Sequence, residues 1–203
     1  MKINQLFNDL VSTLIGRNRP VSAEAPKASS ELPEDLVTYD DQAEKVTRFT
    51  RPSKYRGTKQ FQGASDDVMN AILEMSLKHK MDPKFTGSVA RQESSFRPNV
   101  ISPDHGVGLF QLTPTDRNPY GGGNPLYNQY SDEQLMDPRM NADLGIQQLA
   151  GLLEKAQTRV SPDLAERDAY LMYNAGPNYA NQKPESLKKY RRRADLWEQI
   201  FKD

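Results

Sequence analysis

A single glutamate, Glu93, stands at the end of an apolar helical pattern and directly before a segment rich in turn residues. The stretch reads ARQESSFRPNVISPDHGVGLFQLTP, from Ala90 to Pro114. The dipole of a helix disfavours a negative charge at its C-terminus, and apolar neighbours disfavour the charge further. Both effects favour the protonated carboxyl, so Glu93 is a candidate general acid. From this pattern alone, the alternative is a surface glutamate at a helix end.

Polar side chains that could surround this carboxyl occur in two other places. In GLFQLTP, two glycines let the backbone approach closely, and Gln111 stands among large apolar residues. Far downstream, AYLMYNAGP places Tyr170, Tyr173 and Asn174 near the end of another helical pattern. Aromatic faces pack on sugar rings, and amides hydrogen-bond to hydroxyl and acetamide groups. The residue types therefore suit a saccharide cleft.

These residues need helices to position them, and the sequence predicts a mainly α domain without confident strands. Four capping residues precede helical patterns, namely Ser65, Asp82, Asp137 and Ser161. The predicted helices cover residues 66–80, 83–94, 138–157, 162–175 and 184–201. Residues 101–129 contain many turn formers, including GGGNP, and are predicted to be mostly loop.

The composition excludes several classes of function. The chain has 203 residues with 27 basic and 27 acidic side chains, so no global charge would drive binding to nucleic acid. It contains no cysteine, which excludes thiol catalysis, disulfides and cysteine-ligated zinc. Its two histidines belong to no H-E-x-x-H pattern. We therefore expect neither a metal site nor a cofactor.

The chain divides into an irregular N-terminal arm, residues 1–64, and a catalytic domain, residues 65–203. Within residues 1–15, apolar residues recur at helical spacing, which predicts a short amphipathic helix. That helix would pack on its own domain, or attach to a membrane surface or to a virion. A Pro- and Ser-rich linker follows, and residues 46–61 are basic with interleaved aromatics, which suits either an ordinary surface or a polyanion contact.

Four motifs in order resemble the soluble lytic transglycosylase family, the goose-type-lysozyme-like branch of the lysozyme superfamily. They are E-S after a helix, a serine turn leading into GLFQ, the helix DPRMNADLGIQQLAGLL, and YNAGP. The resemblance covers residues 66–201. It implies a lysozyme-like fold and bacterial peptidoglycan glycan strands as the substrate. It also implies that Glu93 is the catalytic acid and base.

The resemblance also implies roles for individual residues around Glu93. It implies a saccharide groove lined by Ser102, Gln111, Tyr173 and Asn174. Tyr190, in SLKKYRRR, is similar to the late tyrosine that approaches the catalytic carboxyl in this family, and Asn141 would be structural. The family usually reads G-A before the G-L-x-Q turn, whereas this chain has His105 and Gly106 there. His105 would tune the pocket or lie at its rim.

The implied reaction breaks the β-1,4 bond between MurNAc and GlcNAc and leaves 1,6-anhydroMurNAc ends. Alternatives are a hydrolysing muramidase, in which Asp104 or Asp116 activates water, and an endopeptidase that cuts peptidoglycan cross-links. A non-catalytic wall-binding protein is a third alternative. The basic cluster at residues 188–193 is either a solvated helix face or a surface that attracts anionic wall polymer or membrane.

The expected place of action is the periplasm or the cell wall, where the substrate lies. The first 20 residues are not a convincing signal peptide, because Asn8 and Asp9 interrupt their apolar region. A cell-wall enzyme without an export signal needs another route to its substrate. A phage virion, or release at lysis, would supply that route.

Overall fold

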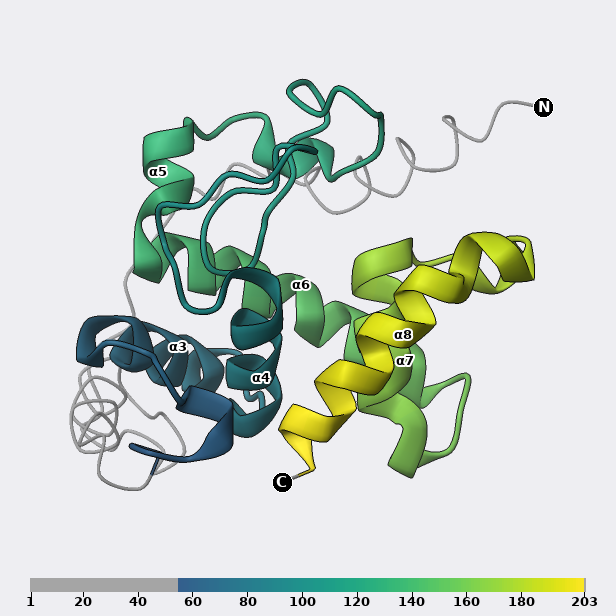
Figure 1. Cartoon of the computed structure of the whole chain (residues 1–203), viewed down its shortest axis with the longest axis horizontal. Coiled ribbons are helices and arrows are strands. Elements are labelled where there is room, and N and C mark those ends of the chain that lie inside the picture. The colour runs from purple at the N-terminus through teal and green to yellow at the C-terminus, as the bar shows by residue number, and fades with distance from the viewer. Residues whose placement is uncertain (1–54, 203) are drawn as a thin grey trace, which may run out of the picture. The chain divides into compact units, whose positions relative to one another are not determined.

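The structure, a computed structural model, describes residues 55–202. The predicted N-terminal helix and most of the predicted arm lie outside the described residues. Within the described range the chain is helical, with only isolated bridges between Ile101, Val107 and Leu112, which confirms the mainly α prediction (Figure 1). The α-helices are α3 (Asp66–Lys78), α4 (Pro83–Ser94), α5 (Asp132–Met136), α6 (Pro138–Gln157), α7 (Ala165–Ala175) and α8 (Pro184–Phe201). The 3-10 turns are η2 (Lys59–Phe61), η3 (Pro125–Tyr127), η4 (Pro162–Leu164) and η5 (Tyr179–Asn181).

Side-chain caps fix where the helices begin, as predicted in three cases out of four. Ser65 accepts a hydrogen bond from the third residue of α3, and Asp82 and Asp137 do the equivalent for α4 and α6. The predicted cap at Ser161 was wrong. Ser161 makes no side-chain cap bond, because the chain first forms the 3-10 turn η4 and α7 begins only at Ala165.

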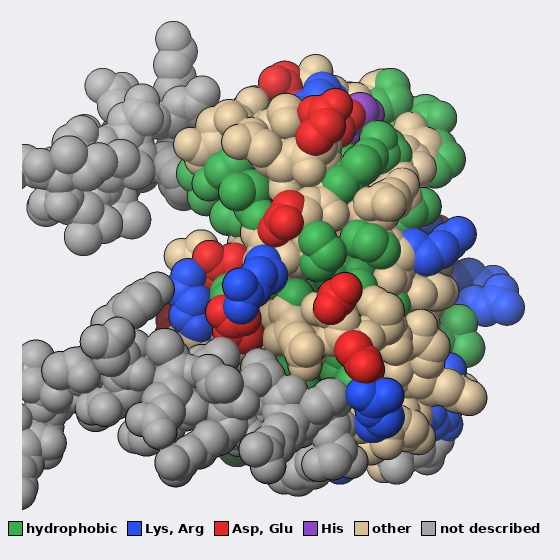
Figure 2. All heavy atoms as spheres, turned by 90° about the vertical axis from the view of Figure 1, so that its left-hand side faces the viewer, with side chains coloured by type: hydrophobic (Ala, Val, Ile, Leu, Met, Phe, Trp, Pro, Cys, Tyr) green, Lys and Arg blue, Asp and Glu red, His purple; other side chains and the backbone are tan. Residues whose placement is uncertain are grey.

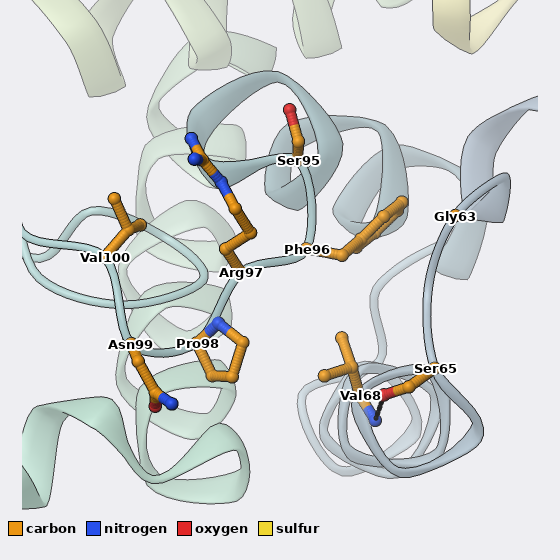
Figure 3. A pocket seen from close by; sticks show the side chains of 9 residues that line it. All are labelled: Gly63, Ser65, Val68, Ser95, Phe96, Arg97, Pro98, Asn99 and Val100. Carbon is orange, nitrogen blue, oxygen red and sulfur yellow. Dashed lines mark hydrogen bonds between the residues drawn. The ribbon is translucent and has the colours of Figure 1, made fainter.

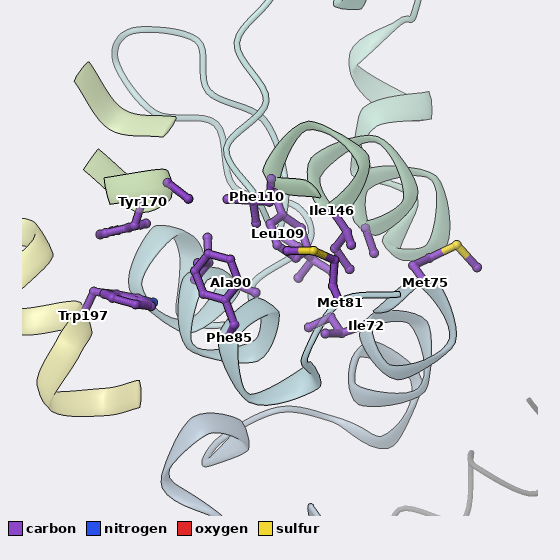
Figure 4. Close-up of a cluster of buried hydrophobic side chains, with 14 of the residues drawn as sticks. Ile72, Met75, Met81, Phe85, Ala90, Leu109, Phe110, Ile146, Tyr170 and Trp197 are labelled. Carbon is purple, nitrogen blue, oxygen red and sulfur yellow. The ribbon is translucent and has the colours of Figure 1, made fainter. Parts of the chain in front are cut away.

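The core lies where the helices converge. Helix α6 packs against α3 and α7, and α8 packs against α7 and α4. Figure 4 shows Phe85 of α4, Tyr170 of α7 and Trp197 of α8 meeting at one end of this core. Trp197 stacks on Tyr170 with ring centroids 5.2 Å apart and meets Phe85 edge-on at 5.4 Å. These aromatic contacts fix the relative positions of α4, α7 and α8.

Residues just before the predicted domain start also belong to the core. Tyr55 and Phe61 are buried, and Phe61 stacks on Phe96 with centroids 6.1 Å apart. The side chain of Gln60 donates hydrogen bonds to the carbonyls of Ile200 and Phe201, at 3.0 and 3.2 Å. The segment around η2 therefore ties the C-terminal end of α8 to the domain, although it lies before residue 65.

Surface charges on the described part are mixed in sign. Figure 2 shows acidic and basic side chains interspersed on one face. Among the ion pairs between α3 and α6, Lys78 donates to Asp143 at 2.7 Å, and His79 contacts the same carboxylate. An exposed pair such as Lys78–Asp143 contributes about 0–1 kcal/mol. Among residues 55–202, no helix is both long and apolar enough to cross a bilayer.

Candidate active site

Glu93 lies in the last turn of α4, as the sequence predicts. The helix ends at Ser95, which adopts a left-handed conformation (φ 54°) and donates its N–H to the carbonyl of Arg91. The side chain of Glu93 is only 7% exposed. The carboxyl is thus sheltered, as a general acid requires, rather than lying on the open surface.

Two side chains from distant parts of the chain donate to this carboxyl. The hydroxyl of Tyr170, on α7, donates to Oε1 of Glu93 at 2.9 Å. The guanidinium of Arg193, on α8, donates to Oε2 at 2.6 Å. Both oxygens therefore accept a hydrogen bond, which is how proteins hold an ionised carboxylate. The sequence predicted an apolar shelter but did not predict this cation.

Both donors keep the protonation state that this arrangement needs. Burial, and then the negative charge of Glu93, raise the pKa of Tyr170, so its phenol stays a neutral donor. Burial alone would lower the pKa of Arg193, but Glu93 and Tyr170 outweigh this and raise it. The Nε of Arg193 is buried without a hydrogen-bond partner in the described residues. The guanidinium thus interacts with both Glu93 and Tyr170, and its ion pair is with the carboxyl of Glu93.

The GLFQ turn is held in place by Asn141, a fully buried residue of α6. Its side chain accepts from the N–H of Phe110 at 2.8 Å and donates to the carbonyls of Val107 and Leu135. Gly108 has φ +73°, and a Cβ there would lie 2.3 Å from Nδ2 of Asn141. Asn141 is therefore structural, and this glycine is required for the turn to reach it.

The turn presents Gln111 to solvent-accessible space and uses Ser102 internally. Gln111 donates to the carbonyl of Gly108 at 2.9 Å, which leaves its amide oxygen free among the described residues. Ser102 donates to Asp104 at 2.6 Å and accepts from the N–H of Gly106 at 2.8 Å. Ser102 thus stabilises the turn, and the neighbouring acid Asp104 lines the groove described next.

A groove of about 680 Å³ runs beside this turn, between it and the C-terminal end of α7. Its lining includes four of the five predicted substrate-binding residues, namely Gln111, Tyr173, Asn174 and Tyr190, but not Ser102. Asp104 is the only charged side chain among the described residues that line it. The groove is otherwise built from amides, aromatic rings, glycines and aliphatic groups. That chemistry suits a neutral polar chain such as a glycan.

The groove comes within one helical turn of Glu93 along two helices. On α7, Tyr170 contacts Glu93, while Tyr173, three residues later, lines the groove. On α8, Arg193 contacts Glu93, while Tyr190, three residues earlier, lines the groove. Three residues of α-helix span about 4.5 Å. The carboxyl of Glu93 does not itself line the groove, but both of its donors lie one helical turn from a residue that does.

The remaining sequence candidates lie at the edges of this arrangement. His105 contacts the carboxylate of Asp132 at 3.0 Å and is half-buried, and Arg117 pairs with the same carboxylate. His105 has φ +61°, which lies in the left-handed region that favours glycine. Glycine is the usual residue at this position in the family that the sequence resembles. His105 is not among the residues that line the groove. This agrees with a place at the rim.

A separate hollow of about 580 Å³ lies beyond the end of α4. Figure 3 shows Arg97, Pro98 and Asn99 on one side of it and Ser65 and Val68 on the other. The carboxyl of Glu93 instead contacts α7 and α8, so this hollow does not contain the candidate acid.

The family model for the transglycosylase SLT domain matches residues 70–196. The chain belongs to this family. Its members are peptidoglycan lytic transglycosylases, so this SLT protein is an enzyme of that kind, and peptidoglycan is its substrate class. The matched segment includes Glu93, the GLFQ turn, the YNAGP motif and Tyr190.

The sequence does not identify two residues that contact Glu93 in this SLT domain. Tyr170 lies in the AYLMYNAGP motif, but the resemblance implies site roles for Tyr173 and Asn174 instead. Arg193 cannot be told from the other basic residues of α8 by its sequence context. Its only signal is its spacing of three from Tyr190, which places both on one face of the helix. No group of three or more acidic or histidine side chains within residues 55–202 could hold a metal ion.

Proposed function

We propose that this SLT protein cleaves the β-1,4 bond between MurNAc and GlcNAc, with Glu93 as the single general acid and base. The products would be glycan fragments with 1,6-anhydroMurNAc ends. The observation that supports this most is the position of the carboxyl. It is sheltered and hydrogen-bonded on both oxygens, one helical turn from a groove of neutral amides and aromatic rings.

In the first step, protonated Glu93 donates its proton to the glycosidic oxygen, and the bond from that oxygen to C1 of MurNAc breaks. The carbonyl oxygen of the N-acetyl group on MurNAc stabilises the positive C1. Glu93 is then a carboxylate. Tyr170 and Arg193 both donate to a carboxylate at this position, so they stabilise the state that follows proton donation.

In the second step, the carboxylate of Glu93 takes the proton from the C6 hydroxyl of the same sugar, and O6 bonds to C1. Glu93 is protonated again, and no water is consumed. A single residue can thus serve as acid and then as base, in place of the carboxylate pair that most glycosidases use.

The groove residues offer acceptors and an aromatic face to the sugar. The amide nitrogen of Asn174 donates to the carbonyl of Tyr170 at 3.1 Å, so its oxygen is left to accept. Gln111 is held in the same way by the GLFQ turn. The hydroxyl of Tyr173 donates to the carbonyl of Phe110, and burial raises its pKa well above the usual value. Tyr173 would therefore contribute its ring, and the two amide oxygens would accept from sugar hydroxyls or acetamide N–H groups.

A hydrolysing muramidase is the second candidate, and one observation favours it. Asp104 lines the groove, so a second carboxylate is present that could activate water. Asp116 does not line the groove and instead contacts Arg117. If Asp104 were the base for water, the wild type would release products with reducing ends, and Asp104→Asn would abolish cleavage.

Mass spectrometry of fragments released from purified peptidoglycan tests the proposal. We expect 1,6-anhydroMurNAc ends from the wild type, and also from Asp104→Asn. Reducing MurNAc ends would contradict the transglycosylase reaction and support the muramidase. New free amines without sugar cleavage would instead identify an endopeptidase.

We further propose that the protein acts in the periplasm or cell wall, where peptidoglycan lies. Delivery on a phage virion, or attachment to a membrane through residues 1–15, remains part of this proposal. Those residues lie outside the described part of the chain. Fractionation of a full-length protein and of one lacking residues 1–15, with purified virions and with lipid vesicles, would test the attachment.

A further inference from the structure

A second large hollow lies on the exposed side of α8 and has a strong excess of positive charge. Its volume is about 810 Å³. Four cationic residues line it, namely Lys188, Lys189, Arg192 and Arg193, against one acidic residue, Glu185. The groove beside the GLFQ turn has no cationic lining residue among the described ones. The two hollows therefore suit different parts of a ligand.

Most of the positive charge of this basic hollow is not neutralised by the described part of the protein, because Arg193 alone of its four cations is paired there, with Glu93. Lys188 and Arg192 are exposed and form no ion pair within residues 55–202, and Lys189 lies over the ring of Tyr190 at 4.6 Å. Elsewhere on the domain, Arg167 pairs with two acids of α8, Asp195 and Glu198. Lys188 and Arg192 thus remain available to an external anion, whereas Arg193 and Arg167 are already paired with acids of the domain.

The basic hollow joins the catalytic region through two residues. Tyr190 lines both the hollow and the groove. Arg193 lines the hollow and donates to Glu93. Leu196, at 44% exposure, adds an apolar surface to the same hollow. An anionic group that branches from a chain lying in the groove near Glu93 would therefore reach these cations.

We propose that the basic hollow binds the carboxylates of the stem peptide that branches from the MurNAc residue at the cleaved bond. This inference rests on the proposed function and adds a specificity to it. The stem peptide hangs from the lactyl ether of MurNAc and carries several carboxylates, while the glycan itself is neutral. Lys and Arg are the side chains that bind such groups, Arg by paired N–H donors. The charge and the position of the hollow both match this occupant.

The test compares cleavage of peptide-bearing glycan strands with cleavage of the same strands after an amidase has removed the peptides. The double variant Lys188→Gln/Arg192→Gln removes two cations of the hollow. The matched control Lys183→Gln/Arg191→Gln removes two exposed cations of the same helix region that do not line it. All four positions are exposed, so the variants should fold, which circular dichroism checks.

For the wild type we expect a higher kcat/KM on peptide-bearing strands, carried by a lower KM and weakened by salt. In the Lys188→Gln/Arg192→Gln variant, called the hollow variant below, the ratio of kcat/KM on peptide-bearing strands to kcat/KM on denuded strands should fall by about tenfold. This is the size expected for losing two partly screened charge contacts. The control variant should keep the wild-type ratio.

Three outcomes would overturn the inference. The first is a wild type that cleaves both kinds of strand equally well. The second is an equal fall of the ratio in both double variants. The third is a hollow variant whose defect appears only on walls that carry phosphate polymers, or only in binding to anionic vesicles. In each case cleavage of denuded strands leaves the proposed function standing, whereas failure of the wild type to cleave either strand would refute the function itself.

Discussion

The ion pair between Glu93 and Arg193 can be measured by a double-mutant cycle with Glu93→Gln and Arg193→Gln. In Arg193→Gln, a carboxyl that is 7% exposed keeps Tyr170 as its remaining donor in the described structure. Breaking a fully buried pair costs about 3–5 kcal/mol, because the remaining charge is uncompensated. Since the side chain of Arg193 is 40% exposed, water screens the pair, and we expect a cost of about 1–3 kcal/mol.

Urea denaturation near neutral pH would measure this cost in both backgrounds. Arg193→Gln should lower the free energy of unfolding by about 1–3 kcal/mol when Glu93 is present. In the Glu93→Gln background the same change should cost less than about 1 kcal/mol, because no buried charge is left behind. High salt should reduce the difference between the costs of Arg193→Gln in the two backgrounds only modestly, since the carboxyl of Glu93 is sheltered. An equal cost in both backgrounds would refute the idea that Arg193 acts on Glu93.

Three further predictions concern the surroundings of the site. Tyr170→Phe should keep the fold, because the ring still stacks on Trp197, but should lower kcat about tenfold with little change in KM; steady-state kinetics on purified walls would show this, and an unchanged kcat would contradict it. Asn141→Ala should lower the free energy of unfolding by at least about 3 kcal/mol, since three buried backbone groups lose their partner; a change below about 1 kcal/mol in urea denaturation would be inconsistent with this. Burial would raise the pKa of Asp143, but hydrogen bonds from Lys78 and His79 outweigh burial and lower the pKa. The stabilisation that Asp143 provides is therefore present above its unfolded pKa and is lost as the pH falls through its folded pKa; Asp143→Asn should remove about 1 kcal/mol at neutral pH and nothing in strong acid, which thermal unfolding against pH would test.

The helices could be predicted from the sequence because their signals are local. Ser65, Asp82 and Asp137 each cap a helix within three residues, and the apolar spacing that follows identifies the buried face. Ser161 has the same signal but makes no cap, because the chain takes a 3-10 turn before α7. Local sequence does not determine which of these two geometries the neighbouring helices favour.

The candidate acid could also be predicted, whereas its partners could not. Glu93 is the only carboxylate in the segment just before the GLFQ turn that lies at a helix end. Arg193 is one of three consecutive arginines, and only the packing of α8 against α4 distinguishes it from its neighbours. Tyr170 and Tyr173 lie three residues apart on α7, so both fit the pattern equally well. Which of them contacts Glu93 depends on how α7 packs against α6 and α8, and this is a tertiary property.

The most direct test of the central claim is the rate at which purified Glu93→Gln protein solubilises bare peptidoglycan. The amide cannot donate and recover a proton as the carboxyl does, and general acid–base catalysis contributes about 10²–10⁴-fold. We therefore predict a rate at least about a hundredfold below wild type, from a protein whose circular dichroism and unfolding transition show a retained fold. Solubilisation by this variant at a rate close to wild type would contradict the assignment of Glu93 as the catalytic acid and base.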